Sequence, residues 1–256
     1  RRSSDLVWHI VDCMGVCMTL LEGENAAMLV DTGYGIEDVA DFMRHMTDLP
    51  LTVFLTHNHH DHAMGARCFP ETYMLEADMA DWRMFTNDEM RRRVLTQAIG
   101  KNLPVDEKTF LAGEIPLPKV MKPGVIDLGG LTAEIIEAPG HTPGSAVVYV
   151  PERKLLLSGD DWNPCTWLFF PQALGLREYR SNMRGIQQLP FEKVLCPHRE
   201  ALYDRWMFDD FFNALTDGNL RAAEPVNIAP YEQIDTCQAT LPHDQVLVFD
   251  WAKSGL

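Results

Sequence analysis

The residues that could do chemistry are concentrated in residues 56–62, which read Thr-His-Asn-His-His-Asp-His. Four of the nine histidines of the chain lie here. Read as His-x-His-x-Asp-His, the stretch places His57 and His59 two residues apart, so an extended backbone points both rings to the same side. Asp61 and His62 follow, where a turn could aim them at a second metal ion. A polar surface loop is the alternative, and the density of histidines argues against it.

Three further candidate ligands, His141, Asp160 and His198, lie far away in the sequence. His141 stands in Ala-Pro-Gly-His-Thr-Pro-Gly, Asp160 in Ser-Gly-Asp-Asp, and His198 in Cys-Pro-His. Each follows a predicted strand, as the first stretch does. Any one of them alone is as typical of an ordinary loop or surface residue. Together they repeat one arrangement, a strand followed by a ligand, so we predict that they meet residues 57–62 in a metal site.

The elements that must position these residues read as an α/β chain. The apolar periodicity predicts strands at Leu6–Val11, Val16–Leu21, Ala26–Val30, Leu51–Leu55, Tyr73–Leu75, Gly124–Leu128, Leu131–Glu137, Ala146–Val150, Leu155–Leu157, Val194–Leu195, Glu232–Ala239 and Gln245–Trp251. Helical spacing is found at Ile36–Met46, Gly65–Phe69, Glu178–Leu189 and Tyr203–Leu215. Two β-rich halves, each with helices, predict a four-layer αββα sandwich, with residues 1–256 forming a single domain.

Residues 76–118 interrupt this pattern. They are helical up to about Gly100, with Asn87 as a candidate helix cap, and are then punctuated by prolines. We interpret the segment as a helical elaboration that contributes to substrate specificity. The triplet Arg91-Arg92-Arg93 is expected to form a solvated helix face, with an anion-binding site as the alternative.

Composition excludes several classes of function. The formal net charge of −15 argues against a nucleic-acid partner, because phosphate binding needs clustered Lys and Arg. No apolar run reaches the length that would span a membrane. Six scattered cysteines without a Cys-x-x-Cys pair fit a reducing compartment, so we expect a cytoplasmic protein. The expected partner is a small-molecule substrate, and a homo-oligomer is compatible with the sequence.

The ordered set His-x-His-x-Asp-His, Gly-His-Thr-Pro-Gly, Gly-Asp and Pro-His resembles the metallo-β-lactamase-fold hydrolases, particularly their glyoxalase II-like and lactonase-like branches. The resemblance spans roughly residues 31–198 and implies the αββα fold, with two metal ions at one edge between the sheets. It implies that one ion is held by His57, His59 and His141, the other by Asp61, His62 and His198, and that Asp160 bridges them. His60 falls at a variable position and is left out of the ligand set.

This ligand set suits zinc and also admits manganese or iron, because it contains imidazole and carboxylate but no thiolate. Two divalent ions would lower the pKa of a bound water and stabilise an oxyanion. We therefore expect a zinc-dependent hydrolase in which metal-bound hydroxide attacks an ester, thioester or lactone carbonyl, with Asp61 also orienting the water or passing on its proton. A phosphodiesterase of the same fold and a metal-binding module without turnover are the alternatives.

Substrate contacts are expected from the loop after Asp160, where Trp162, Asn163 and Trp167 could line the mouth of a pocket. Packing of these aromatic residues on the core is the alternative. In the lactonase-like branch a Tyr often stands three residues after the bridging Asp, and here that position is Asn163, which argues against a close relation to the lactonases.

Overall fold

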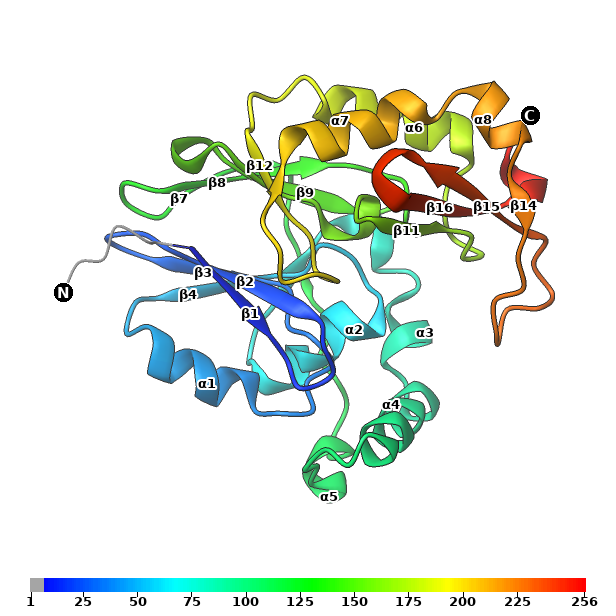
Figure 1. Ribbon diagram of the computed structural model, residues 1–256. Helices are drawn as coiled ribbons and strands as arrows, with labels where there is room; N and C mark the ends of the chain where they lie inside the picture. Colours follow the sequence, from blue (N-terminus) through cyan, green and yellow to red (C-terminus); the bar gives the residue numbers. More distant parts are fainter. Residues whose placement is uncertain (1–6) are drawn as a thin grey trace.

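The layers of the protein follow from the alternation of buried side chains along its central strands. The computed structural model describes residues 7–256. In β9 (Ala146–Val150), Ala146, Val148 and Val150 face one hydrophobic core, whereas Val147 and Tyr149 face another. A strand with both faces buried must lie inside a stack of layers. Two six-stranded sheets lie face to face with helices on their outer sides (Figure 1). The predicted four-layer αββα sandwich is confirmed.

The first sheet has the order β1-β2-β3-β4-β5-β6 and carries the histidine-rich loop after its fourth strand. Its strands are β1 (Val7–Val11), β2 (Cys17–Glu22), β3 (Ala27–Val30), β4 (Leu51–Phe54), β5 (Tyr73–Met74) and β6 (Lys119–Val120). β1 to β3 form an antiparallel meander, and β3 to β6 are parallel. The predicted start of the first strand, Leu6, lies outside the described residues. Helix α1 (Val39–Met46) connects β3 to β4 and covers the outer face.

The second sheet has the order β13-β12-β10-β9-β8-β7. Its other strands are β7 (Gly124–Asp127), β8 (Thr132–Glu137), β10 (Leu155–Leu157), β12 (Lys193–Leu195) and β13 (Tyr203–Asp204). Helices α6 (Leu176–Ile186) and α7 (Arg205–Ala214) cover its outer face, and Tyr179, Met183 and Phe208 pack there. The predicted helix at 203–215 begins two residues later than expected, because Tyr203 pairs with Val194 at the edge of the sheet.

A third sheet, with the order β11-β16-β15-β14, was not predicted as such. It consists of β11 (Cys165–Leu168), β16 (Gln245–Asp250), β15 (Thr236–Leu241) and β14 (Glu224–Pro225). The two strands expected in the tail are present, but β11 and β14 were missed. β11 runs parallel to β16, a pairing between segments about eighty residues apart that no local pattern indicates. A short helix, α8 (Asp217–Arg221), precedes β14.

The segment between β5 and β6 is helical, as predicted. It comprises a 3₁₀ turn at Glu76–Asp78, α3 (Trp82–Thr86), α4 (Asp88–Gly100) and α5 (Glu107–Phe110). The side chain of Asn87 caps α4 by accepting from the backbone N–H of Met90. The expectation of a solvated arginine face is wrong for Arg91, whose buried guanidinium donates to the backbone carbonyls of Phe110 and Gly113.

Two short helices come next in the chain. Helix α2 (His60–Ala63) begins within the histidine-rich stretch, and a 3₁₀ helix spans Met64–Cys68, where the sequence predicted a helix. No helix within residues 7–256 has the length and apolar character needed to cross a lipid bilayer.

Candidate metal centre

The loop after β4 turns the histidine-rich stretch inward. β4 ends at Phe54 and α2 begins at His60. The connection bends at Thr56 and His57 instead of running fully extended, yet the candidate ligand atoms of His57 and His59 point into the same cluster. Both rings are buried, and their centroids lie 4.7 Å apart. The first turn of α2 then places Asp61 and His62 beside them. The grouping of side chains that the sequence predicted is therefore present.

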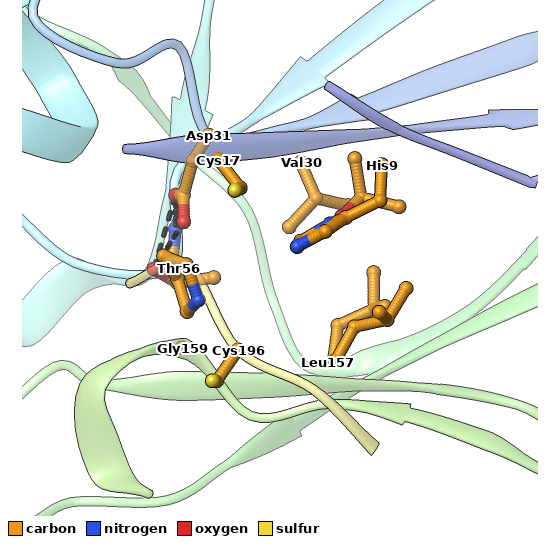
Figure 2. Close-up of a pocket in the computed structure, with 11 residues that line it drawn as sticks. His9, Cys17, Val30, Asp31, Thr56, Leu157, Gly159 and Cys196 are labelled. Atoms are coloured by element: carbon orange, nitrogen blue, oxygen red, sulfur yellow. Dashed lines mark hydrogen bonds between the residues drawn. The ribbon is translucent and has the colours of Figure 1, made fainter. Parts of the chain in front are cut away.

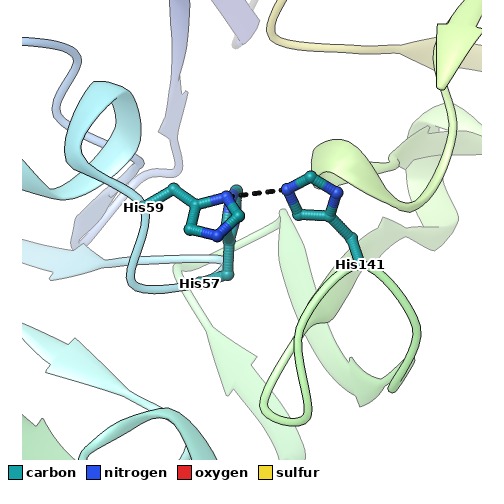
Figure 3. Close-up of side chains that lie close together, drawn as sticks. All are labelled: His57, His59 and His141. Carbon is teal, nitrogen blue, oxygen red and sulfur yellow. Dashed lines mark hydrogen bonds between the residues drawn. The ribbon is translucent and has the colours of Figure 1, made fainter. Parts of the chain in front are cut away.

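His141 completes a first group with these two histidines. It lies on the loop between β8 and β9, which faces the histidine-rich loop across the space between the sheets (Figure 3). Its Nε2 lies 2.8 Å from Nδ1 of His59. The candidate ligand atoms of His57, His59 and His141 all lie within 4.8 Å of one another, the spacing that three ligands of one ion require.

A second group consists of Asp61, His62 and His198, again with ligand atoms within 4.8 Å of one another. Asp160 lies between the two groups. Its Oδ2 is 3.5 Å from Nε2 of His141 and 3.0 Å from Nε2 of His198, and its Oδ1 is 3.4 Å from Nε2 of His62. The structure therefore brings together all seven residues that the resemblance implied, with Asp160 between the two groups.

Asp31 and Thr56 hold the rings of His57 and His62 by hydrogen bonds to Nδ1. Asp31 accepts hydrogen bonds from the backbone N–H and hydroxyl of Thr56, at 2.7 and 2.9 Å, and from Nδ1 of His62 at 3.0 Å. Since the Thr56 hydroxyl donates to Asp31, it must accept from Nδ1 of His57, 3.0 Å away. Both rings thus carry their proton on Nδ1 and turn Nε2 toward the site.

The other two rings of the first group are held by the segment that contains β11. Nδ1 of His141 lies 2.6 Å from the backbone oxygen of Trp167, which can only accept. Nε2 of His59 lies 2.7 Å from the amide nitrogen of Gln172, which donates to it. Binding of a metal ion by Nδ1 of His59 would require the amide to turn over and present its oxygen, because Nε2 would then carry the proton. Sequence reasoning missed Gln172, and no local signal identifies it.

Asp78, the last residue of the 3₁₀ turn after β5, ties the two ligand loops together. Its carboxylate accepts from the backbone N–H of Asn58, the Thr142 hydroxyl and the backbone N–H of Gly144, at 3.1, 2.7 and 2.6 Å. Burial raises the pKa of Asp78 to about 6. Asp161, the neighbour of the candidate bridge, accepts instead from the backbone N–H of His141. Residues on both loops are therefore fixed by buried carboxylates that are not ligands.

The electrostatics of the site favour positive charge at the second group. Burial and the neighbouring histidines lower the pKa values of His57 and His59, so both rings are neutral and able to bind a metal ion. At His62 burial opposes the charged form, but Asp160, Asp61 and Asp31 outweigh it and raise the pKa well above its usual range. The same attraction holds the pKa of Asp61 below its ordinary value despite burial. A site that favours a protonated imidazole among carboxylates also favours a metal cation.

Unpaired buried atoms point to the same conclusion. Within residues 7–256, Nε2 of His57, Nε2 of His62 and Oδ1 of Asp160 are buried and lack a hydrogen-bond partner. Buried polar atoms are normally paired, and an ion is one of the standard explanations when they are not. These three atoms belong to one cluster with matching ligand spacing. The residues present therefore fit divalent metal ions.

A cavity of about 510 Å³ opens onto this cluster and is lined by His59, Asp61, His141, Asp160 and His198 among others. A second, much smaller cavity of about 10 Å³ lies behind the cluster, between the sheets, where Asp31 and Thr56 face Cys17, His9 and Cys196 (Figure 2). It holds no more than about one water molecule. Of these two cavities, only the larger has room for a substrate.

The expected substrate contacts are only partly in place. Asn163 and Trp167 line the larger cavity, but the expectation for Trp162 is wrong. Trp162 is completely buried and packs against Tyr203 and Phe208 in the core beneath α6 and α7. The aromatic run after Asp160 enters β11, so its side chains divide between core and cavity. His60 lies at the cavity wall beside Tyr34 and belongs to none of the candidate ligand groups within residues 7–256.

A four-layer αββα sandwich with a His/Asp cluster at one edge between its sheets defines a class of metal-binding hydrolases. The model of the metallo-beta-lactamase superfamily matches residues 11–198, and the chain belongs to this family. It is 26% identical over 200 residues, 70% of each chain, to the acyl-coenzyme A thioesterase MBLAC2 of Gallus gallus.

Solved structures share the fold. The metallo-beta-lactamase family protein TTHA1429 from Thermus thermophilus matches with a TM-score of 0.58 and 19% identity, over 85% of this chain and 80% of that one. The protein TTHA1623, solved in a di-iron-bound form, matches with a TM-score of 0.55 and 19% identity, over 79% of this chain and 96% of that one.

Proposed function

We propose that this protein is a dinuclear metal-dependent hydrolase that cleaves acyl thioesters. The observation that carries the proposal is the convergence of seven buried or half-buried side chains, of which three present unpaired ligand atoms to one another. The similarity to an acyl-coenzyme A thioesterase favours a thioester among the carbonyl substrates that such a site could take.

The chain would divide the ligands as follows: His57, His59 and His141 for one ion, Asp61, His62 and His198 for the other, and Asp160 for both. Zinc is the preferred metal for this donor set, and manganese or iron also fits. The di-iron form of TTHA1623 is in keeping with iron. Bound divalent ions would supply Lewis acidity and a water of lowered pKa.

Among the protein's own side chains, Asp61 is the candidate proton acceptor. Asp61 is half-buried at the cavity wall, with Oδ2 3.7 Å from Nε2 of both His62 and His198. From there it can orient the attacking water and take its proton. The water oxygen forms a bond to the acyl carbon, the carbon–sulfur bond breaks, and the thiol leaves with a proton, so that a carboxylic acid and a thiol result.

Metal analysis and a substrate panel test this proposal. The purified protein should carry about two equivalents of metal per chain, as a two-metal site requires. Acyl thioesters should be hydrolysed faster than aryl esters, lactones or bis-aryl phosphodiesters, each assayed with Zn, Mn and Fe. Preferred phosphodiester cleavage would replace the thioester assignment, and metal binding without turnover on any substrate would identify a binding module.

Two neighbouring histidines provide a matched pair of variants. His59→Ala should lower the metal content and abolish hydrolysis, whereas His60→Ala should retain both equivalents of metal, because His60 belongs to none of the ligand groups. Full turnover by a folded His59→Ala protein would contradict the assigned ligand set.

A further inference from the structure

A third cavity, of about 290 Å³, adjoins the larger cavity that opens onto the candidate metal centre. The two cavities share three aromatic residues, Phe85 of α3, Phe170 from the loop after β11, and Tyr231. Phe85 and Phe170 pack against the ring of His59, with centroids 4.5 and 4.7 Å away, and Phe170 lies 5.4 Å from Tyr231. This aromatic partition is thus the boundary between the reacting site and a further chamber. We propose that the chamber binds the acyl chain of the substrate.

The chamber has a largely apolar wall. Its apolar wall consists of Met84, Phe85, Met90, Phe170, Pro171 and Tyr231. The side chain of Asn87 caps α4, Glu89 pairs with Arg93 at 2.6 Å, and the Gln172 amide contacts His59. The Glu89 and Arg93 side chains neutralise each other, so the apolar residues supply the surface that an acyl chain would cover. Met84 stands at this wall with 53% of its surface exposed, as expected of a residue that a ligand covers.

The larger cavity has a positively charged side and an apolar side. Arg199 lines it next to the second ligand group, where its guanidinium donates to the backbone carbonyl of His198 at 2.9 Å. The aromatic partition adjoins the first ligand group through His59. An acyl thioester of an anionic thiol such as coenzyme A has two ends of complementary character, a phosphate-bearing thiol and an apolar chain. With its carbonyl over the metal centre, the carrier lies toward Arg199 and the chain toward the partition.

Flexible walls suit a chain of variable length. Met84 and Met90 are unbranched and can adapt to irregular apolar ligands. An aromatic partition without hydrogen bonds between its members can part around a methylene chain without leaving a polar group unpaired. This inference rests on the proposed function, because it assigns the substrate of that same site.

The test compares chain lengths in two independent measurements on the metal-loaded protein. In the first, kcat/KM is measured for coenzyme A thioesters from acetyl to hexadecanoyl. It should rise roughly fourfold for each methylene that enters the chamber and then level off, the gain expected for a buried methylene. In the second, calorimetry measures the affinity of S-ethyl and S-dodecyl coenzyme A, thioethers that cannot be hydrolysed. The dodecyl thioether should bind at least tenfold more tightly.

Met84→Trp fills the chamber, and Met84→Glu places a charge in the path of the chain. Either should remove most of the preference for long over short chains in both measurements. Ile99→Trp is the matched control, because Ile99 is exposed on α4 and lines neither cavity. It should keep the wild-type preference.

The outcomes separate the two proposals. Hydrolysis of thioesters without dependence on chain length, or an unchanged preference in both Met84 variants, overturns the acyl chamber and leaves the thioesterase assignment standing. Tight, Met84-dependent binding of the dodecyl thioether without hydrolysis of any thioester supports the chamber and overturns the assignment.

Discussion

Replacement of Asp31 by Asn probes how the second ligand group is held. Asp31 adopts a left-handed backbone conformation with φ of 64°, which Asn tolerates better than other side chains, so the turn itself should persist. The substitution preserves shape but turns one acceptor oxygen into a donor. Both oxygens of Asp31 are engaged, Oδ1 by the backbone N–H of Thr56 and Oδ2 by Nδ1 of His62. One of these donors must lose its partner.

The size of the effect on metal affinity or stability depends on which donor loses its hydrogen-bond partner. If the new NH₂ faces His62, the imidazole must move its proton to Nε2, and the affinity for the second ion should fall about 10- to 100-fold, or about 1.4–2.7 kcal/mol. If the NH₂ faces Thr56, a buried backbone N–H is left unpaired, and the metal-free protein should lose about 1–3 kcal/mol of unfolding free energy. The protein adopts the less costly arrangement, so at least one of the two quantities must change by about 1 kcal/mol or more.

Two measurements distinguish these cases: competition with a chromophoric chelator for metal affinity, and urea unfolding of the chelator-treated protein for stability. Asp12→Asn is the matched control, because the buried Asp12 carboxylate accepts only backbone N–H groups, including those of Val16 and Tyr34. The control should lose stability with unchanged metal affinity. The reasoning is refuted if Asp31→Asn leaves the affinity within twofold and the stability within about 0.5 kcal/mol, the range of ordinary surface substitutions.

Three further outcomes are expected. Gln172→Met, which removes the hydrogen-bond partner of His59, should weaken binding of the first ion about 10- to 100-fold in chelator competition. Gln172→Glu, whose carboxylate can accept from Nε2 of His59, should retain the affinity, and equal affinities in both variants would assign Gln172 a packing role. Because burial raises the pKa of Asp78 to about 6, the fold prefers the neutral carboxyl, so its contribution to stability is complete below pH about 4 and is lost as pH rises through about 6. Urea unfolding of chelator-treated wild type relative to Asp78→Asn should show a loss of about 3 kcal/mol across this window, and a flat difference would contradict the assignment. Trp162→Ala should cost about 3–5 kcal/mol of stability with the metal content unchanged, and a change in KM at full stability would return Trp162 to the substrate site.

The ligands could be predicted from the sequence because strand ends are visible in it. His57 follows β4, His141 follows β8, Asp160 follows β10 and His198 follows β12. β10 is an apolar run, β4 and β12 end in apolar pairs, and β8 mixes apolar and polar residues. The two sheets face each other, so the loops after these strands meet at one edge. The chemistry of the donors, together with this placement, was enough to identify the cluster.

Other features depend on contacts between segments far apart in the sequence. Trp162 and Trp167 looked equivalent in one aromatic loop, but β11 pairs with β16 and fixes which side chain faces the core. Arg91 looked like part of a charged helix face, yet its guanidinium is buried against the carbonyls of the loop at 110–113. Neither the parallel pairing nor the burial of a cation has a local periodicity from which it could be predicted.

The rings of His57, His59, His62 and His141 are held by hydrogen-bond partners of four different kinds. These are the Thr56 hydroxyl for His57, the Gln172 amide for His59, the Asp31 carboxylate for His62 and the Trp167 carbonyl for His141. Two of them come from the loops around β3 and β4, so the ligands His57 and His62 are oriented by the same sheet that carries them. The other two come from residues 167–172, which connect the third sheet to α6 and also form walls of both cavities. A ligand that displaces this segment must also move the hydrogen-bond partners of His59 and His141. In the proposed enzyme, substrate binding and metal ligation by the first group would therefore be coupled through one short stretch of chain.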